Sequence, residues 1–187
     1  MRTLFIGDVH ACTDELEELI DQVQPSRIIL VGDLFTKGPH PKKMWQLIKK
    51  HRMESTLGNH ELNLLRRRHI KLPEAAYKWI EQCPLFIQGR EYKVVHAGFN
   101  PHGPTLFNDA IYMRYWPNRH SKKFWWNYYT GRKLIIYGHD AMRQLQDHRP
   151  YSLGLDTGCV YGGALTGYIL EEDRIVQVAA KHAYCPT

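Results

Sequence analysis

The fold is decided by the segment Thr3-Leu4-Phe5-Ile6-Gly7-Asp8-Val9-His10, in which a short apolar run ends abruptly in polar residues. Short apolar runs that are bounded by glycine are typical of buried strands. The same layout recurs in four later runs, which end at Asp33, at Asn59-His60, at His96 and at His139. We therefore predict five buried strands, each with polar side chains directly after its carboxyl end.

Segments with helical periodicity separate the early runs. Thr13 is predicted to cap a helix whose apolar face extends to Val23, and Pro41 is predicted to open a second helix. Residues 59–69 and 73–82 have the pattern of two more helices. Strands that alternate with helices predict βαβ units and a largely parallel first sheet.

The C-terminal part has a different character. Residues 151–156, 164–170 and 174–179 are short runs that are separated by Asp-Thr-Gly, Gly-Gly and Glu-Glu-Asp. Short strands with such turns between them are typical of hairpins. The pattern therefore predicts a second sheet that is more antiparallel than the first.

The composition indicates one globular domain over residues 1–187. Hydrophobic residues make up 43% of the chain and charged residues 24%, which excludes a disordered chain. No run approaches the roughly eighteen apolar residues of a membrane span, and Asp8 comes too early for a signal-peptide core. We therefore expect a cytoplasmic protein that has no membrane partner.

Charge and cysteine content narrow the function further. The formal net charge of +6 favours an anionic substrate or partner, although a solvated basic surface would give the same value. The four cysteines contain no C-x-x-C pair, which excludes zinc-ribbon and thioredoxin-like sites. Reduced thiols are the expectation for an unexported chain.

The polar residues after the predicted strands form a candidate metal centre. Ligands bind at the carboxyl ends of strands in open α/β sheets, so these side chains are expected along one rim. Carboxylates, an amide and imidazoles suit Mn, Fe, Zn or similar divalent ions, and they are too many for one tetrahedral zinc. Each residue alone would more often be a helix cap or a hydrogen-bonded side chain, but their recurrence favours a metal centre with two ions. The residues are Asp8, His10, Asp33, Asn59, His60, His96 and His139.

These motifs, in this order, resemble those of calcineurin-like metallophosphoesterases. The motifs are Gly7-Asp8-Val9-His10, Gly32-Asp33, Gly58-Asn59-His60-Glu61, His96-Ala97-Gly98 and Gly138-His139-Asp140. The resemblance is closer to the phosphoprotein-phosphatase branch, which includes bacterial and phage Ser/Thr phosphatases and symmetrical diadenosine tetraphosphate hydrolases. Residues 155–166 are similar to the corresponding stretch of the latter group, and the similarity runs from about residue 4 to residue 170.

The resemblance implies a fold and a reaction. The expected fold is a double β-sheet sandwich flanked by helices, with four layers in the order α/β/β/α. Two divalent ions would be held, with Mn²⁺ as the first choice and Fe, Zn, Ni, Co or Mg as alternatives. A hydroxide that bridges the metals would attack phosphorus in line, and His60 would be the general acid.

The resemblance also implies a role for each ligand. Asp8 and His10 would bind one ion together with Asp33, which bridges both ions and is counted with His60 among the catalytic residues. Asn59, His96 and His139 would complete the second ion, and Asn59 would also contact phosphate. A supporting hydrogen bond to a metal ligand is the alternative role for His60.

The chain departs from the family pattern in three places. The usual G-D-x-x-D-R-G-P reads Gly32-Asp33-Leu34-Phe35-Thr36-Lys37-Gly38-Pro39 here, so Thr36 replaces the Asp that orients the general acid. Lys37 replaces a phosphate-binding Arg and can still neutralise phosphate as a point charge. Ala11 replaces the usual Gly after His10, and Arg114 matches a second phosphate Arg, for which a surface ion pair is the alternative.

Two segments outside the motifs are basic or aromatic. Residues 66–71 are predicted as a solvated helical face, with a polyanion patch as the alternative. Residues 112–129 are dense in aromatic side chains and belong to a short cap around residues 107–131. Most of these rings are expected to pack over the core, whereas Tyr115 and Trp116 are candidates for stacking on a nucleobase.

The sequence therefore predicts a metal-dependent phosphatase of the Ser/Thr-phosphatase and diadenosine-tetraphosphatase branch. Its substrate is expected to be anionic and phosphorylated, either a nucleotide polyphosphate or a phosphoprotein. Symmetrical hydrolysis of dinucleoside polyphosphates is the main alternative within this class. A non-catalytic basic scaffold is a remote alternative, and nucleic acid is a less favoured partner.

Overall fold

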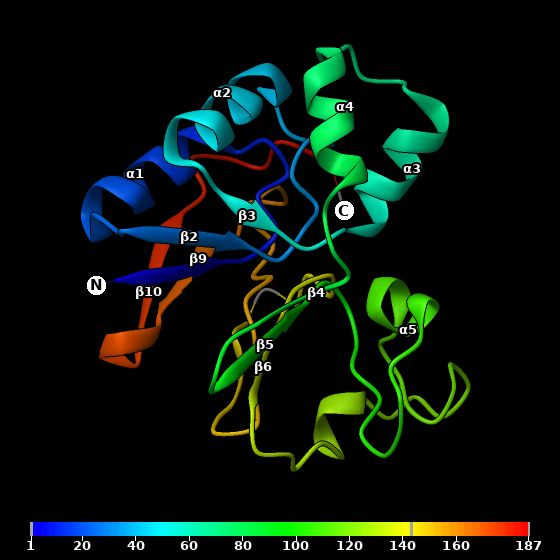
Figure 1. The fold of residues 1–187 in the computed structure, drawn as a ribbon. Helices are drawn as coiled ribbons and strands as arrows, with labels where there is room; N and C mark the ends of the chain where they lie inside the picture. Colours follow the sequence, from blue (N-terminus) through cyan, green and yellow to red (C-terminus); the bar gives the residue numbers. More distant parts are fainter. Residues whose placement is uncertain (1, 143, 187) are drawn as a thin grey trace.

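Two sheets lie at the centre of the computed structural model, which describes residues 2–142 and 144–186 (Figure 1). The first sheet contains β1 (Thr3–Ile6), β2 (Arg27–Leu30), β3 (Glu54–Ser55), β9 (Ala164–Ile169) and β10 (Arg174–Ala179). Its order is β10-β9-β1-β2-β3, in which β1, β2 and β3 are parallel. The pairs β1–β9 and β9–β10 are antiparallel.

The second sheet is built from the middle of the chain. It contains β4 (Phe86–Gln88), β5 (Tyr92–Val95), β6 (Leu134–Tyr137), β7 (Gln146–His148) and β8 (Ser152–Gly154). Its order is β4-β5-β6-β8-β7, with β5, β6 and β8 parallel to one another and the two edge strands antiparallel to their neighbours. Each sheet therefore has a parallel group of strands whose carboxyl ends can carry a site.

Helices flank the two sheets (Figure 1). The helices are α1 (Thr13–Val23), α2 (Pro41–His51), α3 (Asn59–Arg67), α4 (Glu74–Glu81) and α5 (Phe107–Tyr112). Two 3₁₀ turns, η1 (Trp125–Asn127) and η2 (Leu170–Glu172), complete the elements. None of the helices within the described residues is long and apolar enough to span a membrane.

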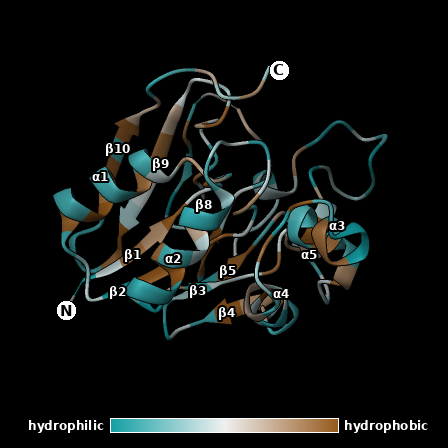
Figure 2. Cartoon of the chain, turned by 90° about the horizontal axis from the view of Figure 1, so that it is seen from above, coloured by the Kyte–Doolittle hydropathy of each residue, from teal (hydrophilic) through white to brown (hydrophobic). Residues whose placement is uncertain are grey.

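The alternation of side chains along β1 sorts the core into layers. Leu4 and Ile6 face α1 and α2, and they pack with Leu16 and Met44 of those helices. Phe5 points the other way and packs between the sheets against residues such as Val94. Figure 2 shows the result, because hydrophobic residues follow the strands and hydrophilic residues cover the outer sides of α1 and α2. The predicted α/β double sandwich is confirmed.

Aromatic side chains form the outer layer of the second sheet. Trp125 is fully buried, and its indole N–H donates to the carbonyl of Ala97 at 3.2 Å. The ring of Trp126 stacks between Phe124, at 4.3 Å, and Tyr137 of β6, at 5.2 Å between centroids. The expectation that most rings of the cap segment pack over the core therefore holds for these residues.

The prediction for the C-terminal strands was wrong in one respect. The hairpin of β9 and β10 exists, but it pairs with β1 and extends the first sheet. The preceding strand, β8, instead joins the second sheet parallel to β6. The pattern of turns predicted the hairpin, whereas the choice of sheet depends on which edge the chain reaches.

The helix boundaries follow the prediction closely, with one correction at a cap. Thr13 is the first residue of α1 and does not cap it, since Cys12 occupies the N-cap position. The hydroxyl of Thr13 is buried without a hydrogen-bond partner among the described residues. The basic residues Arg66, Arg67 and Arg68 lie exposed at the end of α3, as a solvated face requires.

Candidate metal centre

The polar residues that follow five strands meet between the two sheets. The first sheet contributes Asp8 and His10 after β1, Asp33 after β2, and Asn59 and His60 after β3. The second sheet contributes His96 after β5 and His139 after β6. Most of these side chains line a polar cavity of about 200 Å³, which Lys37 and Arg114 also line. The structure thus brings together residues that the sequence separates by more than 100 positions.

Two groups of candidate ligands share one carboxylate. The ring nitrogens of His10 and His60 lie with a carboxylate oxygen of Asp33 inside a span of 4.8 Å. Those of His96 and His139 form a second such group with the same Asp33. Asp33 is only 3% exposed, and a carboxylate has two oxygens. This geometry suits a residue that contacts two cations at once.

The Asn59 amide oxygen joins the second group. It lies 2.9 Å from Nε2 of His96 and 2.8 Å from Nδ1 of His139. The other ring nitrogen of His96, Nδ1, donates to the carbonyl of Val31 at 2.9 Å. Nε2 of a neutral His96 therefore carries a lone pair, and it faces the Asn59 oxygen and the Asp33 carboxylate, which is 3.5 Å away.

The contacts around His96 show whether a cation fits between these side chains. Several acceptor atoms point at one another around His96, and burial lowers the pKa of His96, so a second ring proton does not resolve the contact. A divalent cation between the acceptors would satisfy all of them, and mixed oxygen and imidazole donors suit such ions. The residues present therefore fit a metal ion.

Asp8 lies at the back of the centre. Its carboxylate accepts the backbone N–H of His139, at 3.1 and 3.2 Å to its two oxygens, and it is 3% exposed. It belongs to neither of the two ligand groups. A Cβ on Gly138 would lie 1.9 Å from an oxygen of Asp8, so this close approach requires glycine.

The carboxyl groups and imidazoles of the centre have strongly shifted pKa values when no cation is bound. Burial raises the pKa of the carboxyl groups of Asp8 and Asp33, and neighbouring carboxylates raise the pKa of Asp8 further. Burial and the charge of Asp33 raise the pKa of Glu61 to about 7. Burial lowers the pKa of His60 to about 4. Carboxylates that are costly to ionise and imidazoles that stay neutral are a set that bound cations would stabilise.

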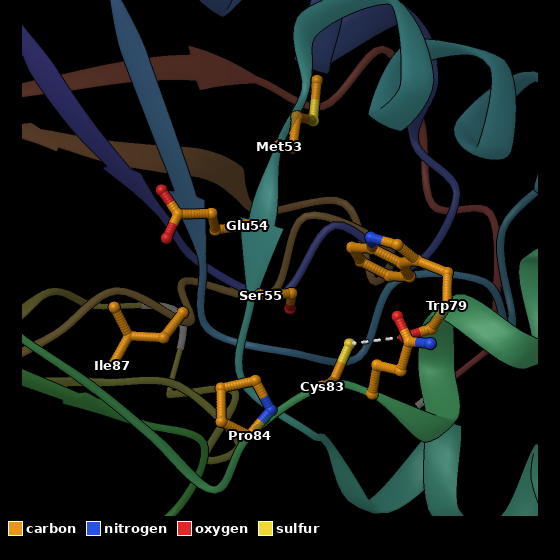
Figure 3. A pocket seen from close by; sticks show the side chains of 8 residues that line it. Met53, Glu54, Ser55, Trp79, Cys83, Pro84 and Ile87 are labelled. Atoms are coloured by element: carbon orange, nitrogen blue, oxygen red, sulfur yellow. Dashed lines mark hydrogen bonds between the residues drawn. The ribbon is translucent and has the colours of Figure 1, made fainter.

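Another cavity of about 230 Å³ lies away from these residues (Figure 3). It is lined by Met53, Trp79, Cys83 and Pro84, among others, and contains none of the predicted site residues. The Cys83 thiol donates to the carbonyl of Trp79 at 3.5 Å, and burial raises the pKa of this thiol. A protonated, hydrogen-bonded thiol is a weak nucleophile, so the polar cavity is the better candidate for chemistry.

Comparison with known proteins agrees with this geometry. The model of the calcineurin-like phosphoesterase family matches residues 1–177. The chain belongs to this family. It is therefore a hydrolase that acts on phosphate esters or anhydrides, and the family implies divalent metal ions at the centre described above.

The relatives of this calcineurin-like phosphoesterase include bis(5'-nucleosyl)-tetraphosphatases of two kinds. The asymmetrical enzyme PrpE of Oceanobacillus iheyensis is 24% identical over 98% of this chain and 94% of the relative. The asymmetrical enzyme PrpE of Halalkalibacterium halodurans is 29% identical over 94% of this chain and 93% of the relative. A symmetrical enzyme of Baumannia cicadellinicola is 25% identical over 97% of this chain and 93% of its own. The first alignment runs over 238 positions, so that relative has residues which this shorter phosphoesterase lacks.

Solved structures share the fold of this phosphoesterase. One described as a "putative diadenosine tetraphosphatase" superposes with a TM-score of 0.86 at 28% identity, covering 96% of this chain and 93% of its own. A metallophosphoesterase from Sphaerobacter thermophilus superposes with a TM-score of 0.67 at 17% identity, covering 97% of this chain and 89% of its own.

Thr36 contacts the predicted general acid of the phosphoesterase. Its hydroxyl oxygen lies 2.7 Å from Nδ1 of His60 and 3.2 Å from Nδ1 of His10. The threonine that replaces the family Asp therefore still holds the His60 ring, with a neutral hydroxyl in place of a carboxylate. Because Nδ1 is engaged, Nε2 is the His60 ring atom on the side of Asp33, 3.9 Å from its carboxylate.

The two predicted phosphate-binding cations line the cavity, and each contacts a different partner. The Lys37 ammonium donates to the phenol oxygen of Tyr161 at 2.5 Å and lies 5.0 Å from the centre of that ring. The Arg114 guanidinium lies 3.5 Å from the carboxylate of Asp140. Both side chains can reach an anion in the cavity, since both line it.

Three polar residues of the cavity were missed by the sequence analysis. Asp156 is 7% exposed and lines the cavity, as do Asp140 and Tyr161. Asp156 directly follows β8 and Leu155, so it has the same apolar-run layout as the predicted ligands. That signal could have identified it, but its Asp-Thr-Gly context was interpreted as a turn.

Glu61 holds the backbone of Asp33, the residue that the two ligand groups share. It is fully buried, and its two oxygens accept the backbone N–H groups of Asp33 and Leu34 at 2.6 and 2.7 Å. Asp33 has a positive φ of 56°, which a residue other than glycine adopts only at some cost. The His60 N–H also donates to the Asp33 carboxylate at 2.9 Å. The beginning of α3 thus fixes both the backbone and the side chain of Asp33.

Proposed function

We propose that this phosphoesterase hydrolyses the phosphoanhydride chain of dinucleoside tetraphosphates. The observation that carries the proposal is the pair of ligand groups that share Asp33, next to the cationic side chains of Lys37 and Arg114. The names of the tetraphosphatase relatives support the substrate class. A nucleotide substrate also agrees with the positive net charge and with the cytoplasmic location expected from the sequence.

Two divalent ions, with Mn²⁺ as the first choice, are proposed to bind at the shared carboxylate. His10 and Asp33 would hold one ion with Asp8 nearby, and Asp33 would hold the other with three further ligands. Those further ligands are Asn59, His96 and His139. The ions would supply Lewis-acid charge for the phosphoryl oxygens and a lowered pKa for water.

The chain's own residues are proposed to bind and protonate the substrate. Lys37 contacts a phosphate oxygen as a point charge, and Tyr161 holds its ammonium in place. Arg114, which lines the same cavity, contacts a second part of the phosphate chain. The anionic phosphate chain favours the protonated His60 ring, whose Nδ1–H donates to the Thr36 hydroxyl oxygen and whose Nε2 proton passes to the leaving oxygen.

Hydrolysis of small phosphomonoesters or of phosphoproteins is a second candidate function. The cavity of about 200 Å³ accommodates a phosphoryl group but is small for a nucleoside, so chemistry at this centre does not by itself require a nucleotide. Both functions use the same centre. Only the group next to the phosphate distinguishes them.

A side-by-side assay tests the proposal. Metal-depleted enzyme is supplemented with Mn²⁺ and given diadenosine tetraphosphate, a phosphopeptide and an aryl phosphate, and the products are separated by anion exchange. We expect the highest kcat/KM for the dinucleotide; two ADP would indicate symmetrical cleavage, and ATP with AMP asymmetrical cleavage. Preference for the phosphopeptide would contradict the proposal and favour the second candidate.

Two controls keep the assay interpretable. The Asp33→Asn variant loses one charge of the shared carboxylate, and we expect it to retain less metal and nearly no turnover. Metal content is measured on wild type and variant after gel filtration. Wild-type activity that survives complete removal of metal by a chelator would contradict the metal centre itself.

A further inference from the structure

A cavity of about 310 Å³ lies between the end of α5 and the loop that follows it. Arg114 lines this cavity and also lines the polar cavity of the metal centre, so the two cavities share a wall. A volume of this size falls within the range of small-molecule sites, which begins at about 300 Å³. An elongated substrate with phosphate at the metal centre can therefore reach the second cavity past Arg114.

Two aromatic rings, those of Tyr112 and Tyr115, line the cavity, and they differ in how they pack against the rest of the protein. Tyr112 stands at the end of α5, lines the cavity and is 45% exposed. Tyr115 forms a backbone bridge with Phe124, and the two rings lie 5.2 Å apart. Phe124 in turn stacks on the buried Trp126. The cavity thus has one ring that packs against other aromatic rings and one that is exposed at its wall.

Trp116, the other ring predicted to stack on a base, does not line this cavity. Its ring packs 4.9 Å from His102 and 5.1 Å from Tyr128. Tyr112 takes its place at the cavity wall, although the sequence analysis did not single it out.

The polar groups of the cavity suit the edge of a base and its sugar. Asn108 and Asn118 line it, and the side-chain oxygen of Asn118 accepts the backbone N–H of His120 at 3.0 Å, which fixes the amide. Asparagine amides pair with purine edges through one donor and one acceptor. Asp109, also at the wall, has one oxygen on the backbone N–H of Leu106 at 3.0 Å and a second oxygen to accept from a sugar hydroxyl.

We propose that this cavity, the nucleoside subsite, binds one purine nucleoside of a dinucleoside polyphosphate, with Arg114 contacting the phosphates that connect it to the metal centre. Tyr112 and Tyr115 contact the base by stacking, and the asparagine amides contact its edge. This inference rests on the proposed function. In this proposal the residues of the short cap determine which substrate binds, and hydrolysis takes place at the metal centre.

The test compares substrates with and without a nucleoside. The ratio of kcat/KM for diadenosine tetraphosphate to that for an aryl phosphate is measured for wild type and for Tyr112→Ala. We expect this ratio to fall about five- to 150-fold in the variant, because stacking contributes about 1–3 kcal/mol per base. The matched control is Tyr151→Ala, which removes a similarly exposed ring (41%) that lines none of the cavities described here, and it should keep the wild-type ratio.

A direct measurement covers the case in which a variant folds poorly. Wild-type enzyme is photolabelled with 8-azidoadenosine triphosphate, and we expect the label within residues 108–119, with protection by excess ADP and none by inorganic diphosphate. Labelling elsewhere, or an unchanged ratio in Tyr112→Ala while wild type still prefers the dinucleotide, would overturn the nucleoside subsite alone. A wild type that does not prefer the dinucleotide would overturn the proposed function and this inference together.

Discussion

The hydroxyl oxygen of Thr36 lies 2.7 Å from Nδ1 of His60, at the position where the family pattern has a carboxylate. The same hydroxyl lies 3.2 Å from Nδ1 of His10, so one small side chain connects two imidazoles. Thr36 is 5% exposed, and water therefore has little access to replace it. The substitution from the family pattern changes the charge behind His60 but keeps a hydrogen bond to its ring.

The first prediction concerns this hydrogen bond. Thr36→Val keeps the shape of the side chain and removes the hydroxyl. We expect kcat to fall about fivefold for substrates with poor leaving groups, since a hydrogen bond of this kind contributes about 1 kcal/mol. The measurement is kcat across aryl phosphates whose phenols differ in pKa. Thr36→Ser should behave like wild type. Equal kcat values for the valine and serine variants would show that Thr36 does not position His60.

A second prediction links Lys37 to Tyr161. Lys37→Met should raise KM for diadenosine tetraphosphate about tenfold, because a hydrogen bond to a charged group contributes about 1.5–3 kcal/mol. Tyr161→Phe should raise KM less, since it only frees the ammonium from its partner. If Tyr161 acts through Lys37, its substitution should have no further effect in the Lys37→Met background. Independent, multiplying effects in the double variant would contradict this coupling.

A third prediction addresses stability through Glu61. Glu61→Gln places an amide NH₂ against one of two backbone N–H donors, and we expect the free energy of unfolding to fall by about 2–3 kcal/mol. Urea unfolding of the metal-free enzyme measures this. Glu17→Gln is the control, because Glu17 pairs with Lys43 on an exposed surface and should cost less than about 1 kcal/mol. Similar losses in both variants would contradict a special role for Glu61.

A fourth prediction concerns Gly58, where the close approach of Asp33 leaves no room for a Cβ. A Cβ on Gly58 would lie 2.3 Å from an oxygen of Asp33 and 2.5 Å from its backbone nitrogen. Gly58→Ala should therefore displace Asp33, and we expect the purified variant to retain less than a tenth of the wild-type metal. Gly103→Ala, where the nearest atom is 3.6 Å away, should retain metal normally. Metal analysis after gel filtration decides between these outcomes, and normal metal content in Gly58→Ala would contradict the geometry.

Much of the centre could be predicted because its polar residues directly follow short apolar runs that form strands. Asp33 and His139 stand directly after apolar runs, and the ends of parallel strands meet at one edge. Glu61 could not be found in this way, because its partners are backbone groups 27 and 28 residues away. The role of Thr36 also depended on distance, since the sequence showed only that a carboxylate was missing.

The arrangement of the strands was harder to predict than their existence. The hairpin of β9 and β10 follows from its turn residues, but its pairing with β1 joins segments more than 150 residues apart. The cap segment illustrates the same limit. Eight aromatic residues between 112 and 129 have one composition, yet Trp125 is buried and Tyr112 is 45% exposed. Only the packing against β6 separates the two roles.

The division of the ligands between the two sheets has a consequence for protein synthesis. Asp33 belongs to the sheet that forms from the N-terminal strands, whereas His96 and His139 follow strands of the other sheet, and β1 gains its second neighbour only when β9 is made. A nascent chain therefore lacks the full set of candidate ligands until His139 has been made, and β1 lacks its second neighbour until β9 has been made.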